Sequence, residues 1–150
     1  GHIKAMQRCR EGLFEYHLES ALVSHFMDNG ARFTAYPSIV GAGDNSCVLH
    51  YIDNNHELKN GDLVLIDAGC EVDCYASDIT RTFPVNGIFT PEQAAIYDVV
   101  LAAQAAAIEQ IAPGLEYNLA NDATIRVITQ GLVDLKLLQG DVDELLTQGA

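Results

Sequence analysis

The chain has 150 residues, 49% of them hydrophobic, which suits one domain with a buried core and excludes a disordered tail. Its 21 acidic and 8 basic residues give a formal net charge of −13, so nucleic acid is not an expected partner. No apolar run approaches the roughly 20 residues of a membrane span. Four cysteines without a signal peptide predict reduced thiols in a cytoplasmic protein.

The sequence of the first two-fifths of the chain predicts helices followed by strands. Residues 1–30 have helical spacing of apolar residues, with a break near Glu11-Gly12 and a stop at Asn29-Gly30. Segments 32–43 and 47–51 are strand candidates on either side of a turn-rich loop. A polar loop then leads to two strands that extend from Leu63 to Phe83.

The last third is predicted to be helical. Thr90, Pro91 and Gln93 form the pattern of a capping box, and the helix that they begin ends at Pro113-Gly114. A second helix is predicted from about Asn118 to Leu138. The segment "DVDE", residues 141–144, opens a third helix, which is cut off at the end of the chain. The chain also begins with a helical pattern that has no capping residue before it. Both ends therefore indicate that the chain is a piece of a longer parent protein.

Two aspartates, Asp67 and Asp78, interrupt the apolar strands between Leu63 and Phe83. A two-residue turn at Val72-Asp73 would pair Glu71 with Cys74, and this register places the aspartates directly opposite each other. Like charges so placed repel each other, whereas one or two divalent cations would make the arrangement favourable. Hard oxygen ligands favour manganese, magnesium, calcium or zinc, with cobalt possible. The alternative to a metal site is that both aspartates lie on a solvent-exposed face of the hairpin.

Cys70 and Cys74 offer a rival metal site, because their spacing is similar to half of a zinc clamp. In the predicted register the two thiols lie on opposite faces of the hairpin, and no later cysteine or histidine completes a tetrahedral set. A structural zinc site is therefore not expected.

The same residues resemble a known family. The string "GDLVLIDAGCEVDCYASDITRTFPVNGIFTPEQAAIYDVVLAAQ" is similar to the aminopeptidase P (Xaa-Pro aminopeptidase) branch of the pita-bread metallopeptidases, which also include prolidase, methionine aminopeptidase and creatinase. Upstream "GLFEYHLES" and "GARFTAYPSIVGAGDNSCVLHY" and downstream "GLVDLKLLQGDVDELL" match the same branch. The resemblance implies an α+β fold, with an antiparallel sheet covered by helices. Residues 1–150 would be the first half of the pita-bread catalytic domain, truncated at its carboxyl end.

The resemblance also implies roles for Asp67, Asp78, His50 and Tyr36, and the predicted hairpin places Thr80 on the same face as the two aspartates. Asp67 and Asp78 would hold two divalent metal ions, most often Mn2+ in this branch, with Zn2+ or Co2+ possible, and Asp78 would bridge them. His50 matches a histidine that contacts substrate near the metals and is the candidate catalytic residue. Thr80 could hydrogen-bond a ligand carboxylate, and Tyr36 matches a tyrosine near the site.

The implied activity of the parent is hydrolysis of the bond between an amino-terminal residue and proline, by a water that the two metal ions activate. The alternatives are prolidase, which acts on dipeptides, and a non-catalytic pita-bread domain that binds peptides or proteins. The family uses a further histidine and two glutamates as ligands, and none of them matches here. We therefore expect the chain alone to bind Mn2+ weakly, to be inactive, and to self-associate through the face left exposed.

Overall fold

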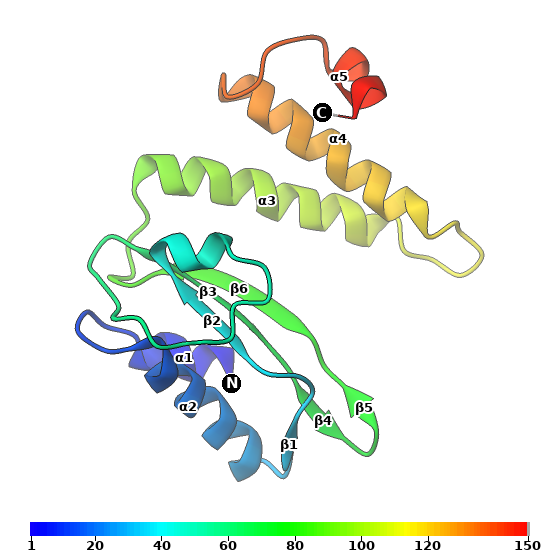
Figure 1. Cartoon of the computed structure of the whole chain (residues 1–150). Coiled ribbons are helices and arrows are strands. Elements are labelled where there is room, and N and C mark those ends of the chain that lie inside the picture. Colours follow the sequence, from blue (N-terminus) through cyan, green and yellow to red (C-terminus); the bar gives the residue numbers. More distant parts are fainter. Residues whose placement is uncertain (150) are drawn as a thin grey trace. The chain divides into compact units, whose positions relative to one another are not determined.

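The computed structural model describes residues 1–149. The chain divides into two compact units, Gly1–Phe89 and Thr90–Ala150. The first unit holds two α-helices, one short 3-10 helix and all six strands, and the second holds three α-helices, as Figure 1 shows. All strand pairs are antiparallel, so the predicted α+β class is confirmed. Within the described residues, no helix is both long enough and apolar enough to cross a membrane.

Two helices begin the first unit: α1 spans His2–Arg8 and α2 spans Glu15–Asp28. The predicted break at Glu11-Gly12 is confirmed, and Gly12 has the left-handed backbone (φ 81°) that glycine adopts readily. At the start of α2, the main-chain N–H of Phe14 donates a 2.9 Å hydrogen bond to Nδ1 of His17. This bond satisfies a donor that the helix itself leaves unpaired.

The six strands form two small antiparallel sheets. One sheet has the order β2-β3-β6, with β2 at Ile39–Ala42, β3 at Leu63–Ala68 and β6 at Ile79–Pro84. The other has the order β1-β4-β5, with β1 at Phe33–Thr34, β4 at Cys70–Val72 and β5 at Tyr75–Ala76. The predicted strand segment 32–43 is thus two strands, which are separated around Pro37. Proline has no N–H to offer a strand ladder.

The core of the first unit lies between β3 and the two helices. Residues of β3 alternate between buried and half-buried, as expected for a strand with one face in the core. Val64, Ile66 and Ala68 are buried in one cluster with Leu18 and Leu22 of α2. Figure 1 shows α1 and α2 on one side of the β2-β3-β6 sheet. The other face of β3 carries Leu65 and Asp67.

The predicted register of the hairpin was wrong. Val72 pairs with Tyr75 and Glu71 with Ala76, so the two turn residues are Asp73 and Cys74. Both have positive φ, 53° and 68°, which is the geometry of the type I′ turns that fit twisted hairpins. Moving the turn by one residue shifts every pair by two positions.

Asp67 consequently lies opposite Thr80 and not opposite Asp78. Because side chains alternate between faces with a period of two, a shift of two positions keeps both aspartates on the same face of the hairpin. The wrong register therefore gave Asp67 the wrong cross-strand partner, but it correctly placed Asp67 and Asp78 on one face of the hairpin.

The predicted strand at residues 47–51 was also wrong. A 3-10 helix, η1 (Gly43–Cys47), occupies its start, and the following residues form a loop. His50 in this loop has φ of 55°, a left-handed conformation incompatible with a strand. Val48, Leu49 and Ile52 are exposed there, with Leu49 91% exposed. The apolar character of the segment therefore reflects an exposed loop and not a buried strand.

The second unit consists of α3 (Pro91–Glu109), α4 (Asn118–Asp134) and α5 (Val142–Gln148). The predicted capping box of α3 is confirmed: Thr90 Oγ1 accepts from Gln93 N–H, and Gln93 Oε1 accepts from Thr90 N–H. Asp141 caps α5 with its side chain, which accepts from the N–H groups of Asp143 and Glu144. Gly131 of α4 lies against Val99 of α3, with no room for a Cβ atom, so these two helices pack closely.

Candidate metal centre

Tyr36 lies between the two candidate metal ligands. Its hydroxyl is 2.5 Å from Oδ1 of Asp67 and 2.9 Å from Oδ1 of Asp78, within hydrogen-bonding distance of both. A tyrosine hydroxyl has a single hydrogen, so the two carboxylates compete for one donor. Both carboxylates therefore point one oxygen to the same position in space.

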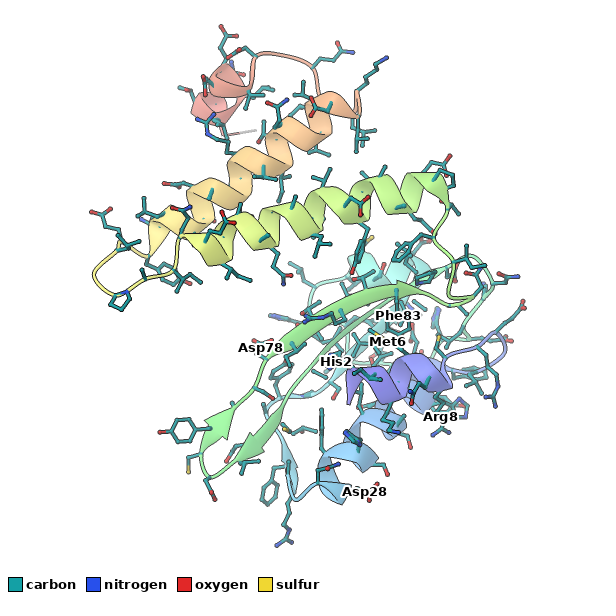
Figure 2. All side chains as sticks on the ribbon, turned by 180° about the vertical axis from the view of Figure 1, so that it is seen from behind. His2, Met6, Arg8, Asp28, Asp78 and Phe83 are labelled. Atoms are coloured by element: carbon teal, nitrogen blue, oxygen red, sulfur yellow. The ribbon has the colours of Figure 1, made fainter. Side chains whose placement is uncertain are left out.

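Local geometry explains this convergence. Asp67 extends from β3, flanked by Ile39 of β2 and Thr80 of β6, while Asp78 directly precedes β6, at the end opposite Phe83 (Figure 2). At Gly69 the hairpin closes so tightly that an added Cβ would lie 1.7 Å from the main-chain oxygen of Ser77. Only glycine permits this approach, which brings the chain around Asp78 against β3.

The charges of the two aspartates also affect Tyr36. The pKa of its phenol is raised well above the usual value, first by burial, then by the hydrogen bonds to Asp67 and Asp78 and by their negative charge. The phenol stays protonated because its ionisation would place a third negative charge beside two carboxylates. Tyr36 is thus a neutral donor in this site.

The donor set fits part of a site for hard divalent cations. Carboxylate oxygens are the ligands that such cations prefer, and here one carboxylate from β3 and one from the residue before β6 converge. The hydrogen bonds to Tyr36 use only Oδ1 of each aspartate, which leaves both Oδ2 atoms free to coordinate. Within residues 1–149, however, no group of three or more histidine, cysteine, aspartate or glutamate side chains gathers at one place. Asp67 and Asp78 can therefore supply two ligands and not a complete set.

The structure gives less support to the other two predicted site residues, Thr80 and His50. The main chain of Thr80 pairs with that of Asp67, but the side chain of Thr80 is exposed and makes no hydrogen bond to Asp67 in the described structure. His50 is exposed in the loop after η1, and no hydrogen bond links it to either aspartate among residues 1–149. The structure thus brings together Asp67, Asp78 and Tyr36 and leaves the roles of His50 and Thr80 as predictions.

Glu15 holds the segment around His50, and sequence reasoning missed it. Its carboxylate is fully buried. It accepts hydrogen bonds from Ala42 N–H (2.8 Å), Tyr51 Oη (2.7 Å), His56 N–H (3.0 Å) and Asn45 Nδ2 (3.2 Å). Four donors compensate for burying one charge and tie α2 to both ends of the loop. In the sequence, Glu15 is only an acid in the first turn of a helix, where acids are common.

The cysteines are the rival candidate ligands, and among residues 1–149 none of them belongs to a group of three or more potential metal-binding side chains. Cys9, Cys47, Cys70 and Cys74 are all free thiols. Cys74 is exposed in the hairpin turn, and Cys70 is half-buried in β4, where its sulfur contacts Ser77 Oγ.

Comparison with known proteins identifies the class of the chain. Residues 1–145 match the model of metallopeptidase family M24. The chain therefore belongs to the M24 metallopeptidases. It is 57% identical over 150 residues to Xaa-Pro aminopeptidase of Haemophilus influenzae and 50% identical over 149 residues to that of Escherichia coli.

Solved structures agree with this membership. The structure of the aminopeptidase PepP of Pseudomonas aeruginosa matches with a TM-score of 0.97 and 62% identity, covering 99% of this chain and 34% of that one. A zinc-substituted E. coli aminopeptidase P in complex with product matches with a TM-score of 0.96 and 50% identity. The fold is thus that of the corresponding part of aminopeptidase P. The chain spans 35% of the H. influenzae relative and 34% of the E. coli relative.

Proposed function

We propose that this chain supplies part of the active site of a metal-dependent aminopeptidase, one that cleaves the bond between an amino-terminal residue and proline. The observation that carries the proposal is the convergence of Asp67 and Asp78 on one hydroxyl, in a chain whose relatives are Xaa-Pro aminopeptidases. A binding module has no need for two carboxylates that converge on one hydroxyl, because their like charges repel each other when no cation is bound.

Asp67 and Asp78 are the proposed ligands of two divalent ions, with Mn2+ as the first candidate and Zn2+ or Co2+ as alternatives. Such ions supply Lewis-acid activation of water and polarise the carbonyl of the scissile bond. Tyr36 is proposed to orient the two carboxylates, because its hydroxyl lies within hydrogen-bonding distance of Oδ1 of each. Thr80 is proposed to hydrogen-bond a ligand carboxylate when the metals are present, since its main chain already lies opposite Asp67.

His50 is the proposed substrate-contacting residue. The loop that carries it is tied to α2 through Glu15, which binds Asn45 on one side of His50 and Tyr51 and His56 on the other. His50 itself is exposed, which leaves its imidazole accessible to a peptide. The proposed substrate is a peptide with proline at the second position.

We further propose that residues 1–150 form the first half of a pita-bread catalytic domain, with the remaining metal ligands outside this chain. Its match to about a third of its relatives, and the presence of only two converging ligands in residues 1–149, support this. A cytoplasmic location is proposed from the four free thiols. Prolidase activity, limited to dipeptides, and a non-catalytic peptide-binding role are the alternative functions.

A segment exchange tests the function. The chain replaces its matching segment in the H. influenzae Xaa-Pro aminopeptidase, and the chimera is assayed with Mn2+ on peptides that have proline or alanine second. We expect cleavage of the proline peptides, loss of turnover in Asp67→Asn and Asp78→Asn chimeras, and no loss in Asp98→Asn, which matches the charge change. The chain alone should show no turnover.

The outcomes separate the alternatives. Cleavage of Xaa-Pro dipeptides but not of longer peptides would favour prolidase. A folded chimera that binds peptides without cleaving them would favour the non-catalytic role. Full activity in a folded Asp78→Asn chimera would refute the proposed site.

A further inference from the structure

The carboxylate of Glu15 binds the loop that carries His50 on both sides of this histidine. Its Oε1 accepts from Asn45 Nδ2 at 3.2 Å, before His50 in the chain. Its Oε2 accepts from Tyr51 Oη at 2.7 Å and from His56 N–H at 3.0 Å, after His50. The two oxygens of one carboxylate therefore hold separate segments of the loop, and His50 lies on the stretch of chain between them.

Tyr51, the residue directly after His50, connects these bonds. Its hydroxyl accepts from Asn45 Nδ2 at 3.1 Å and donates to Glu15 Oε2, so the three side chains form a closed ring of hydrogen bonds. The bond between Asn45 and Tyr51 joins residues six positions apart and closes the segment that contains His50 into a small loop. Because Glu15 is fully buried, these bonds form in a surrounding of low dielectric constant, which strengthens them.

His50 has a backbone conformation that needs such support. Its φ of 55° lies in the left-handed region, which is unfavourable for a residue that has a Cβ atom. Residues 51–56 belong to no helix or strand, so side-chain bonds and not a strand ladder hold the chain that follows His50. A residue persists in a strained conformation only where the surrounding structure fixes it, and such residues are concentrated at functional sites.

We propose that Tyr51 is a positioning residue for His50: its hydroxyl, bonded to Glu15 and Asn45, holds the left-handed turn that presents the imidazole to the peptide substrate. The inference rests on the proposed function of His50 and adds a residue that acts through it. Its effect is on binding, because a loop that adopts the binding conformation for only part of the time lowers the apparent affinity by that fraction. The proposed metal ligands lie on other segments, so the chemical step should be unaffected.

Tyr51→Phe is the variant that tests this inference. It removes one hydroxyl and keeps the ring, so it breaks the bonds to Glu15 and Asn45 without leaving a large cavity. Tyr16→Phe is the matched control. Tyr16 lies next to Glu15 on α2, but among residues 1–149 the donors to that carboxylate do not include its hydroxyl.

The first measurement is steady-state kinetics of the chimera described above, with Mn2+ and peptides that have proline second. We expect Tyr51→Phe to raise KM about tenfold while kcat changes by less than about twofold, and Tyr16→Phe to change neither. A bond that served stability alone would behave differently, because its loss would reduce the amount of active enzyme and so lower the apparent kcat with KM unchanged. Circular dichroism confirms that both variants are folded.

The second measurement requires no turnover. Order parameters of the main-chain amides are obtained by NMR relaxation on the 150-residue chain itself. At His50 we expect about 0.85 in the unchanged chain and in Tyr16→Phe, and less than about 0.6 in Tyr51→Phe. The amides of α2 should remain at about 0.85 in all three, which would show that only the loop has become mobile.

Three results would each overturn the inference: an unchanged KM in a folded Tyr51→Phe chimera, a fall in kcat alone, or an unchanged order parameter at His50. An unsubstituted chimera without turnover would be a different result, because it would refute the proposed function. The order parameters would then decide alone whether Tyr51 positions His50.

Discussion

The hydroxyl of Tyr51 donates a 2.7 Å hydrogen bond to Oε2 of Glu15, whose carboxylate is fully buried. Replacing Glu15 with alanine would leave four donors without an acceptor inside the first unit. We expect the free energy of unfolding to fall by about 3–5 kcal/mol, as when a partner is removed from a buried charged network. Glu15→Gln should cost less, because its amide oxygen still accepts. Urea unfolding followed by circular dichroism measures both.

Glu19→Gln is the control for this prediction. Glu19 lies on the same helix but is only half-buried, and its carboxylate accepts one hydrogen bond, from Asn54 Nδ2 at 3.0 Å. A loss of about 1 kcal/mol or less is expected there. Equal effects of Glu15→Ala and Glu19→Gln would show that the Glu15 network contributes little to stability.

Tyr51 should make the stability of the chain fall at alkaline pH. Its pKa is raised to about 12, first by burial, then by the hydrogen bond to Glu15 and by the negative charge there. An unfolded tyrosine has a pKa of about 10. The folded chain therefore keeps a proton that the unfolded chain releases. The stabilisation is complete below about pH 10 and is lost as the pH rises towards 12.

Comparison with Tyr51→Phe isolates this effect, because phenylalanine does not titrate. The difference in unfolding free energy between the two chains should shrink by about 1–2 kcal/mol between pH 10 and 12, allowing for solvent screening. If the unfolding free energies of the two chains changed equally with pH over that range, Tyr51 would titrate in the folded chain as it does in the unfolded chain.

The regular elements of the fold were largely predictable from the sequence, because their determinants are local. Spacing of apolar residues and capping patterns located α2 and α3, and the Thr90–Gln93 capping box formed as expected. The register of the hairpin failed because it depends on which two residues adopt positive φ. The sequence "EVDCY" contains no glycine or Asn-Gly pair to mark the turn at Asp73 and Cys74.

The candidate site was predictable only where the residues were unusual for their surroundings. Asp67 and Asp78 are acids in segments that were predicted to be apolar strands, so both were identified. Glu15 and Asn54 were not, because acids in first turns and asparagines in loops are ordinary. Their importance arises from tertiary hydrogen bonds to β2, across 27 and 14 positions in the chain, which no local pattern encodes. The close approach of Gly69 to the main chain of Ser77 was not predicted for the same reason, because it too depends on tertiary structure.

Replacing Asp78 with asparagine should stabilise the metal-free chain. Asp67 and Asp78 approach the same hydroxyl, so their charges repel each other, and the amide oxygen of asparagine can still accept from Tyr36. Because Asp78 is exposed, we expect a gain of only about 0.5–1 kcal/mol at low salt, and less at high salt. Thermal unfolding in the presence of a chelator measures it.

Asp98→Asn controls for the change in net charge, since Asp98 is exposed on α3 and has no acidic partner of this kind among residues 1–149. Weak Mn2+ binding, followed by electron paramagnetic resonance, should be lost in Asp78→Asn and kept in Asp98→Asn. A destabilised Asp78→Asn chain would mean that the carboxylate contributes more through its hydrogen bond than it costs through repulsion.

Gly69 should be among the least replaceable residues of the first unit. A Cβ there would lie 1.7 Å from Ser77 O and 2.5 Å from Ser77 C, both main-chain atoms that cannot rotate away. We expect Gly69→Ala to cost about 3 kcal/mol or more, because the hairpin must open to admit the methyl group. Opening the hairpin would also separate Asp67 from Asp78, so weak Mn2+ binding should disappear together with the stability.

Gly87→Ala distinguishes this steric effect from the ordinary cost of replacing a glycine. Gly87 has φ of 77°, and a Cβ added there would have no neighbouring atom within 4 Å, so alanine meets backbone strain alone, about 1 kcal/mol. Urea unfolding of both variants and Mn2+ titration of both should separate them clearly. If Gly69→Ala cost no more than Gly87→Ala and retained Mn2+ binding, the close contact with Ser77 would not be what brings the two aspartates together.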